Sequence, residues 1–532
     1  MHETPEALIE RLVARDQSLW PGEHSPPLGW LDSVDFIEQH GSDLMQWASL
    51  LVMDRQVKQI LLMGMGGSSL SVEVLYSVFG RKRNFPELVV VDTTSPETLN
   101  QLEINDKTLF VVSSKSGTTI ETLALYSWLH ERAKTLDGPP NKRFLAITDP
   151  GTQLAKTALS EEFLHLSVNP RDIVGRYSAL SYFALLPAAL LGIDLVRLGS
   201  RLRKKWLDYL SGQSPDLVNL IEIMSACSTS GYGLLGLDLP SPLGSLFAWI
   251  EQLVAESTGK QGKGILPVEP DRINERMVSS GNYRSVKIGM QGCLNSSDEG
   301  HQAPGHATIT MQDEYDLGGI FMLWMAATSV VSSLLNVNAF DQPDVEASKK
   351  QSRHIVEGNQ SRSVMVENHD FSHSTIRFDT QTPDVIRNRV GDFCKQAGQD
   401  SYLAILAYLP REVRVEESLE KLADAFKSRF GAVTIGFGPR YLHSTGQLHK
   451  GGPQIGCFLE IVEEGGIEID IPGRKYGFSR LHRAQSDGDF LVLEKSRRPI
   501  LRLLIRGDRF QELDRLTQLL LNRKTTGSDA KT

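Results

Sequence analysis

The sequence predicts an α/β protein with two doubly wound parallel-sheet domains in series and a third, C-terminal α/β domain. From about residue 56, short apolar runs alternate with amphipathic stretches of helical period, as in parallel strands joined by helices. Glycine- and hydroxyl-rich turns follow two of the expected strands. The expected divisions are a helical segment 1–55, a first sheet domain 56–204, a second 205–350, a linker 351–373 and an accessory domain 374–532.

The expected strands follow from short apolar runs bounded by polar or glycine-containing turns. In the first domain they are residues 60–63, 88–91, 108–112 and 144–148. In the second they are 232–237, 283–289 and 307–311, with helices at 243–256 and 317–335. In the third they are 402–407, 432–436, 457–461 and 501–505, followed by an amphipathic helix. Two similar units in series predict a structural repeat without a repeat of identical residues.

Composition narrows the function without defining it. A net charge of -9 argues against a general nucleic-acid binder, so no nucleic-acid partner is expected. The four cysteines are far apart without metal or redox spacing, which favours a reducing cytoplasm. The N-terminus lacks the apolar core of a signal peptide. Residues 317–340 are uncharged and long enough to span a bilayer, but their serines, threonines and asparagines favour a helix buried in the protein, so no membrane partner is expected.

The most informative stretch is VSSKSGTTIET at residues 112–122, where an expected strand runs into hydroxyl side chains and one lysine. An amphipathic helix follows, so free N–H groups and the positive end of the helix dipole lie beside these hydroxyls, an arrangement suited to a phosphate monoester. Thr118 and Glu121 have capping-box spacing. An ordinary strand-to-helix turn is the alternative, although such turns rarely carry so many donors.

A second candidate turn is GMGGSS at residues 64–69, with Asp92 ending the next strand. This resembles a dinucleotide fingerprint, but Ser69 stands at the third glycine position. Ser68 at the start of a helix suits a sugar phosphate equally well. The second phosphate-type turn favours the sugar phosphate.

Glu256 is the candidate general base. We expect its helix to begin with Ser241 as N-cap and Pro242 at the first helical position. Gln252 and Glu256 are four residues apart and share a face. A carboxylate in the last turn before Gly259 faces the negative end of the helix, which favours proton uptake. From the residues alone, a solvated surface glutamate is an equally good interpretation.

Five motifs occur in series: GGS at 66–68, SKSGTT at 114–119, GRYS at 175–178, ESTGK at 256–260 and FDQP at 340–343 followed by Lys349. Their order resembles the phosphoglucose isomerase family, whose fold consists of two SIS domains, over about residues 55–355. The stretch GFGPRYLHSTGQLHKGGP at 436–453 resembles the isomerase part of bifunctional transaldolase/phosphoglucose isomerases. No transaldolase barrel fits in the chain, so a transaldolase would be a separate partner.

The resemblance implies an intramolecular oxidoreductase of the aldose–ketose isomerase class, active in glycolysis and gluconeogenesis on glucose 6-phosphate and fructose 6-phosphate. It implies no cofactor and no metal, and a homodimer with shared active sites. The implied catalytic residues are Glu256 as base, Arg176 at the enediolate, Lys349 near the ring oxygen and His301 for ring opening. The implied substrate-binding residues are Gly67, Ser68, Ser114, Lys115, Ser116, Thr119, Gln252 and Gln342.

Several alternatives stay open at this point. His306 lies in the same loop as His301 and competes for the ring-opening role. His443, His449 and Lys450 are candidates in the third domain, where a structural turn is the preferred interpretation. The rival functions are an isomerase that also accepts mannose 6-phosphate, a sugar-phosphate-binding SIS protein without catalysis, and a dehydrogenase. A mere binder needs only the phosphate turns, so Glu256, Arg176 and Lys349 together argue against it.

Overall fold

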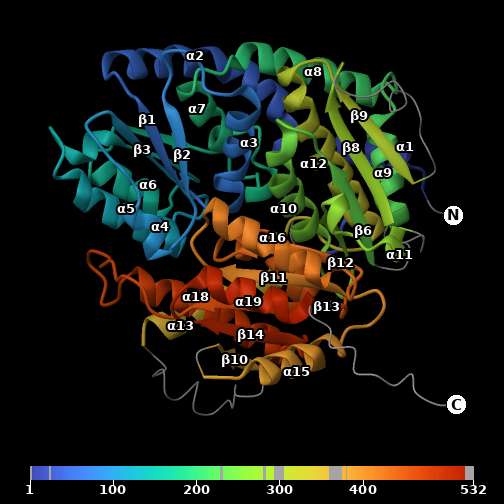
Figure 1. Cartoon of the computed structure of the whole chain (residues 1–532). Coiled ribbons are helices and arrows are strands. Elements are labelled where there is room, and N and C mark those ends of the chain that lie inside the picture. The colour runs from blue at the N-terminus through green and yellow to red at the C-terminus, as the bar shows by residue number, and fades with distance from the viewer. Residues whose placement is uncertain are drawn as a thin grey trace, which may run out of the picture.

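Three parallel sheets with covering helices make up the protein (Figure 1). The computed structural model describes residues 3–22, 25–227, 232–278, 283–292, 305–358, 374–378 and 380–521. The first and second sheets lie side by side, and the third domain, orange to red in Figure 1, lies against both. The predicted fold class is therefore confirmed, whereas the domain boundaries remain a prediction.

The N-terminal helices and the first sheet domain agree closely with the predicted pattern. The N-terminal helices are α1 (Pro5–Val13) and α2 (Ser33–Asp54), with 3-10 turns η1 (Gln17–Leu19) and η2 (Gly29–Asp32). The strands are β1 (Gln59–Met63), β2 (Glu87–Val91), β3 (Thr108–Ser113), β4 (Phe144–Thr148) and β5 (His165–Val168). The helices and 3-10 turns are η3 (Gly66–Ser68), α3 (Leu70–Phe79), α4 (Pro96–Asn100), α5 (Ile120–Ala133), η4 (Pro140–Arg143), α6 (Gln153–Ser160), η5 (Gly175–Tyr177), α7 (Tyr182–Leu190) and α8 (Leu195–Leu210).

The second domain contains one strand that the sequence did not reveal. Its strands are β6 (Tyr232–Asp238), β7 (Gly264–Val268), β8 (Tyr283–Met290) and β9 (His306–Met311). Its helices and 3-10 turns are α9 (Asp216–Cys227), η6 (Leu243–Ser245), α10 (Leu246–Thr258), η7 (Pro270–Arg272), α11 (Glu275–Val278), η8 (Glu314–Asp316), α12 (Leu317–Leu334) and α13 (Pro343–Val356). Pro267 obscured β7 because proline weakens a strand pattern, yet β7 is an edge strand and tolerates it.

The third domain adds a sheet of five parallel strands. These are β10 (Thr375–Arg377), β11 (Tyr402–Tyr408), β12 (Ala432–Phe437), β13 (Gly456–Glu463) and β14 (Ile500–Ile505). Its helices and 3-10 turns are α15 (Pro383–Cys394), α16 (Val413–Lys427), η10 (Arg440–His443), α17 (Gly446–Gly451), α18 (Phe478–Lys495) and α19 (Arg509–Leu521).

One strand order recurs in all three sheets. The first contains β2-β1-β3-β4, the second is β7-β6-β8-β9 and the third contains β12-β11-β13-β14. In each of these sets of four, the second strand in chain order lies on one side of the first strand. The third and fourth strands follow on its other side. Ligands of open parallel sheets bind where the strand order reverses in this way. The predicted structural repeat thus has three copies, and the third domain is a further unit of the same order.

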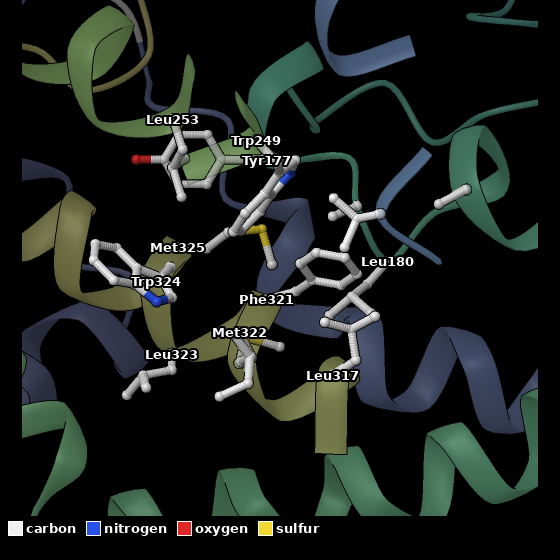
Figure 2. Close-up of a cluster of buried hydrophobic side chains, with 14 of the residues drawn as sticks. Tyr177, Leu180, Trp249, Leu253, Leu317, Phe321, Met322, Leu323, Trp324 and Met325 are labelled. Atoms are coloured by element: carbon white, nitrogen blue, oxygen red, sulfur yellow. The ribbon is translucent and has the colours of Figure 1, made fainter. Parts of the chain in front are cut away.

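Helix α12 is the apolar segment that is long enough to cross a membrane. Glu314–Leu334 satisfies that criterion by length and composition, but 89% of its apolar window is buried inside the protein. Figure 2 shows side chains of α12 packed beside Tyr177 and Trp249. The Trp249 and Phe321 rings lie 4.6 Å apart, between α10 and α12. The prediction of a helix buried between layers fits this packing.

Three local predictions were wrong. Helix α5 begins after Thr119, which makes no side-chain cap, and Glu121 turns to the third domain instead of completing a capping box. Helix α10 begins at Leu246 after a 3-10 turn, so Ser241 is not its N-cap. The expected linker starts inside α13, whose polar residues face α18: Ser348 Oγ donates to Asp489 Oδ1 at 3.2 Å. Residues 359–373 of that linker lie outside the described residues.

The third domain is joined to the first by buried polar contacts. Arg440 Nη1 donates to Asp92 Oδ2 and Nη2 donates to Glu73 Oε2, both at 2.6 Å. His482 Nδ1 lies 2.9 Å from Thr94 Oγ1. Burial lowers the pKa of His482 to about 4.

We expect His482 to make the folding of this protein sensitive to acid. Between about pH 6.5 and pH 4 the unfolded chain binds a proton on this histidine that the folded chain does not bind. Stability should therefore fall as pH falls through this window, by at most about 3.5 kcal/mol at roughly 1.4 kcal/mol per pKa unit. Urea denaturation at several pH values should give a flatter dependence for His482→Gln than for wild type. Equal slopes would contradict the assignment.

Candidate active site

A cavity of about 490 Å³ opens where the three domains meet. Its wall includes the turns after β1 and β3, helix α10, the start of α13, and residues of η10 and α18. β1 and β3 pair in parallel with Met63 opposite Val112, so their following turns lie at one edge of the sheet. This edge is also the point at which the strand order of the first sheet reverses.

The turn after β1 contributes backbone more than side chains. Gly67 packs so closely on the neighbouring turn that a Cβ there would lie 2.0 Å from the carbonyl oxygen of Gly175. Ser68 is 7% exposed and lines the cavity. Ser113 Oγ donates to the Ser68 carbonyl oxygen at 2.9 Å, which ties this turn to the end of β3.

The turn after β3 places hydroxyls and one ammonium group on the cavity wall. Lys115, Ser116 and Thr119 line it. Ser114 is 1% exposed, and its hydroxyl lies behind the wall, 3.0 Å from Thr119 Oγ1. Lys115 Nζ also pairs with Asp149 Oδ2 at 2.5 Å, so its charge is shared with a carboxylate at the end of β4.

Glu256 and Arg176 form a buried ion pair at the cavity wall. Arg176 Nη1 lies 3.1 Å from Glu256 Oε1, and the two residues are 3% and 6% exposed. Gln252, one turn earlier on α10, donates from Nε2 to Glu256 Oε2 at 3.1 Å. The interpretation of Glu256 as a solvated surface residue was therefore wrong, because the residue is buried between Arg176 and Gln252.

Arg176 is held by more than its carboxylate. Its Nε donates to Ser257 Oγ at 2.9 Å, and Nη2 donates to the carbonyl oxygens of Ala339 at 2.5 Å and Asp341 at 3.0 Å. Nη1 also lies 3.4 Å from Gln342 Oε1. A guanidinium group fixed at all three nitrogens offers a rigid positive charge to a ligand beside Glu256.

Helix α13 supplies the remaining predicted residues. Gln342 is its N-cap, and Lys349 lies on the following turns, where both line the cavity. Lys349 Nζ pairs with Glu346 Oε1 at 3.2 Å. Lys260, at the end of the ESTGK motif, is buried beneath this region and pairs with Asp341 Oδ1 at 3.0 Å. Its burial lowers its pKa to about 7.

Comparison with known proteins identifies the relatives of this chain. The family model for phosphoglucose isomerase matches residues 41–261. A glucose-6-phosphate isomerase of Staphylococcus saprophyticus is 28% identical over 386 residues, covering 62% of this chain and 86% of that protein. A probable glucose-6-phosphate isomerase of Methanococcus maripaludis is 25% identical over 370 residues, covering 61% and 84%. Over residues 41–261 this chain is thus similar to phosphoglucose isomerases.

Two solved structures show the same fold. A hypothetical protein from Thermus thermophilus has a TM-score of 0.55 and 23% identity, covering 66% of this chain and 95% of that one. A glucose-6-phosphate isomerase from Chlamydia trachomatis has a TM-score of 0.52 and 17% identity, covering 69% and 87%. At these identities the likeness concerns the fold of a phosphoglucose isomerase and not its residues.

The histidines that were candidates for ring opening lie in different places. His301 lies outside the described residues. His306 begins β9, is exposed, and has Nδ1 2.5 Å from Ser285 Oγ, away from the residues that line the cavity. His449 is 1% exposed beside Tyr402, and Lys450 pairs with Asp489 at 2.6 Å inside the third domain. A structural role fits His449 and Lys450. His443, in contrast, lines the cavity.

Three further residues of this candidate site were missed from the sequence. Glu121 is 4% exposed, lines the cavity and contacts His443. Gln485 on α18 donates from Nε2 to Glu121 Oε1 at 2.7 Å, and Glu346 pairs with Lys349. No local motif marks Glu121 or Gln485, because each contacts a partner from another element. Within the described ranges, no group of three or more His, Cys, Asp or Glu residues could hold a metal ion.

Proposed function

We propose that this chain interconverts glucose 6-phosphate and fructose 6-phosphate by proton transfer through a cis-enediol. The observation that carries the proposal is the buried pair of Glu256 and Arg176, 3.1 Å apart, in a cavity that two phosphate-type turns also line. A carboxylate beside a fixed cation suits a reaction in which a proton leaves carbon and negative charge develops on oxygen. The match of residues 41–261 to the phosphoglucose isomerase model supports the same reaction.

In the proposed mechanism, Glu256 removes the C2 proton of the open-chain aldose and returns it to C1. Electrons of the C2–H bond form the C1–C2 double bond, and charge collects on the carbonyl oxygen, where Arg176 stabilises it. The O2 hydroxyl proton then passes to O1, so the negative charge moves to O2. The electron pair of the C1–C2 double bond takes the proton from Glu256 at C1, which leaves a ketone at C2 and a hydroxyl at C1. The reaction is internally balanced, so it requires no redox cofactor and no metal.

The two turns after β1 and β3 are proposed to hold the substrate phosphate. Gly67, Ser68, Lys115, Ser116 and Thr119 line that part of the cavity. Ser114 is proposed to orient the Thr119 hydroxyl from behind, at 3.0 Å. Gln252 and Gln342 border the sugar, and Lys349 is proposed to lie near its ring oxygen.

Thr119→Ala is expected to raise KM for both sugar phosphates by roughly 10- to 100-fold, because a hydroxyl bonded to a charged group contributes about 1.5–3 kcal/mol. The phosphate is bound alike in ground and transition states, so kcat should change by less than about threefold. Thr119→Ser keeps the hydroxyl and serves as the matched control. An unchanged KM in Thr119→Ala would remove this turn from phosphate binding.

The test of the proposed function is incubation of the purified chain with fructose 6-phosphate in the presence of EDTA while glucose 6-phosphate is followed. Formation of glucose 6-phosphate at enzymatic rates would support the isomerase. Binding without turnover would leave only a sugar-phosphate-binding protein. A parallel assay with mannose 6-phosphate measures the breadth of the substrate range.

We also propose the pathway, the compartment, the oligomeric state and a partner of the enzyme. Action on glucose 6-phosphate places it in glycolysis and gluconeogenesis, and we propose the cytoplasm as its compartment. We propose a homodimer, as the resemblance implies, with molecular mass by light scattering as its test. A separate transaldolase is a candidate partner, to be sought by co-purification with the full chain.

A further inference from the structure

The third domain brings one of its residues into the cavity formed by the first two. His443 ends η10 and is fixed from both sides. Its carbonyl oxygen accepts a hydrogen bond from Gln252 Nε2 at 2.7 Å, and Gln252 also contacts Glu256. Gly66 approaches it so closely that a Cβ there would lie 2.8 Å from the same carbonyl oxygen.

Arg440, three residues earlier, anchors η10 to the first domain. It bridges Asp92 and Glu73 at 2.6 Å each. The position of His443 over the phosphate turns is therefore determined by contacts with the first and second domains, and not by the third domain alone. These contacts hold the backbone of η10, so they do not depend on the imidazole ring of His443.

The imidazole ring of His443 is oriented by a buried carboxylate. Its Nε2 lies 3.1 Å from Glu121 Oε1, and the two side chains are 12% and 6% exposed. Gln485 Nε2 donates to the same oxygen at 2.7 Å, and Thr94 Oγ1 donates to Gln485 Oε1 at 2.7 Å. Burial works to raise the pKa of Glu121, but His443 and then Lys349 outweigh it and lower that pKa.

An ionised Glu121 can only accept, so His443 donates from Nε2. When the imidazole ring is neutral, the other ring nitrogen, Nδ1, then carries a lone pair. Within the described part of the chain no hydrogen bond to Nδ1 is formed, and the residue lines the cavity. A carboxylate that fixes the tautomer of an imidazole and leaves its second nitrogen free for substrate is the arrangement of a general base.

We infer that His443 is a catalytic residue that opens and closes the sugar ring, and that it acts within its own chain. This inference rests on the proposed isomerase function. It differs from the assignment implied by the resemblance, in which His301 of a neighbouring subunit performs this step. The third domain thereby becomes part of the active site and not merely an accessory unit.

The proposed step balances as follows in the closed ring of glucose 6-phosphate. His443 Nδ1 takes the proton of the anomeric hydroxyl, and the electron pair of that O–H bond forms the C1 carbonyl. The bond between C1 and the ring oxygen breaks, and its electron pair goes to that oxygen. The ring oxygen takes a proton from the ammonium group of Lys349, and solvent returns the proton from His443 to Lys349.

The test measures ring opening separately from isomerisation. Opening and closing interconvert the α and β anomers of glucose 6-phosphate, which NMR exchange spectroscopy detects without any C2 proton transfer. In the full chain, His443→Gln should lower enzyme-catalysed anomer exchange by about 100-fold or more, because general acid–base catalysis contributes at least that much. The glutamine Nε2 can still donate to Glu121, so a purely structural histidine would lose little.

Glu256→Gln supplies the complementary measurement, with isomerisation lost and anomer exchange largely kept. Anomer exchange retained in His443→Gln but lost in His301→Gln or His306→Gln would overturn the inference. Wild-type isomerisation would still stand in that case, so failure of the inference is distinguishable from failure of the proposed function.

Chemical rescue distinguishes loss of the base from misfolding of the variant. His443→Ala leaves a space beside Glu121, and added imidazole should restore anomer exchange in proportion to its unprotonated form. A structural role predicts no such rescue. Absence of rescue in a variant that melts within a few degrees of wild type would also count against His443 as the base.

Discussion

Glu256→Gln is expected to lower kcat for isomerisation by about 100- to 10,000-fold, the usual contribution of a general base. The amide keeps the shape of the side chain and can still accept from Arg176, whose Nη1 lies 3.1 Å from the carboxylate. Binding of fructose 6-phosphate, measured by calorimetry, should therefore stay within about threefold of wild type, and the loss should appear in kcat.

Glu251 on the same helix provides a matched control for this substitution. It lies outside the active-site cavity, and burial, together with the charge of Glu269, raises its pKa to about 8. Its carboxyl group is thus largely protonated at pH 7, and Glu251→Gln replaces one neutral group by another. Activity should stay within about twofold of wild type. A Glu256→Gln variant as active as this control would exclude Glu256 from the mechanism.

Gly67→Ala is expected to lower kcat/KM by about 100-fold or more without removing any functional side chain. The new Cβ would lie 2.0 Å from the Gly175 carbonyl oxygen and 2.9 Å from the Arg176 backbone nitrogen. These are backbone atoms that no rotamer change can move away. The turn carrying Arg176 must shift, and displacements of about 1 Å in an active site cost roughly 100-fold in rate.

Overpacking of this kind should also lower the free energy of unfolding of Gly67→Ala by about 1–3 kcal/mol. Gly244→Ala is the control, since a Cβ at Gly244 meets no atom within 4 Å. Steady-state kinetics and urea denaturation of both variants separate the two effects. Wild-type kinetics in Gly67→Ala would mean that the contact between the two turns does not position Arg176.

The elements that could be predicted are those encoded over a few adjacent residues. Every strand expected in the three sheets is present within about two residues of its predicted ends. The strands that were missed are short or carry a proline, as in β5 and β7. Helix starts were less accurate: α10 begins at Leu246 because a 3-10 turn precedes it, and its N-cap Ser245 makes no side-chain hydrogen bond to the helix.

The burial of Glu256 could not be derived from its helix. Glycine turns and hydroxyl clusters indicate a phosphate site because their chemistry is local. A glutamate near the end of a helix is ambiguous, since its environment depends on which elements cover it. The structure covers Glu256 with Arg176 from η5 and with Gln252, which leaves it 6% exposed.

By itself, the sequence determined the α/β class, the two phosphate-type turns and the motifs that mark the phosphoglucose isomerase family. Strand periodicity and turn chemistry act over about ten residues, so they can be read along the chain. Only the tertiary structure decided that the third domain borders the cavity and that His443 meets Glu121, 322 residues away in the chain. Such a contact forms when separate domains pack together, and no local pattern encodes that packing.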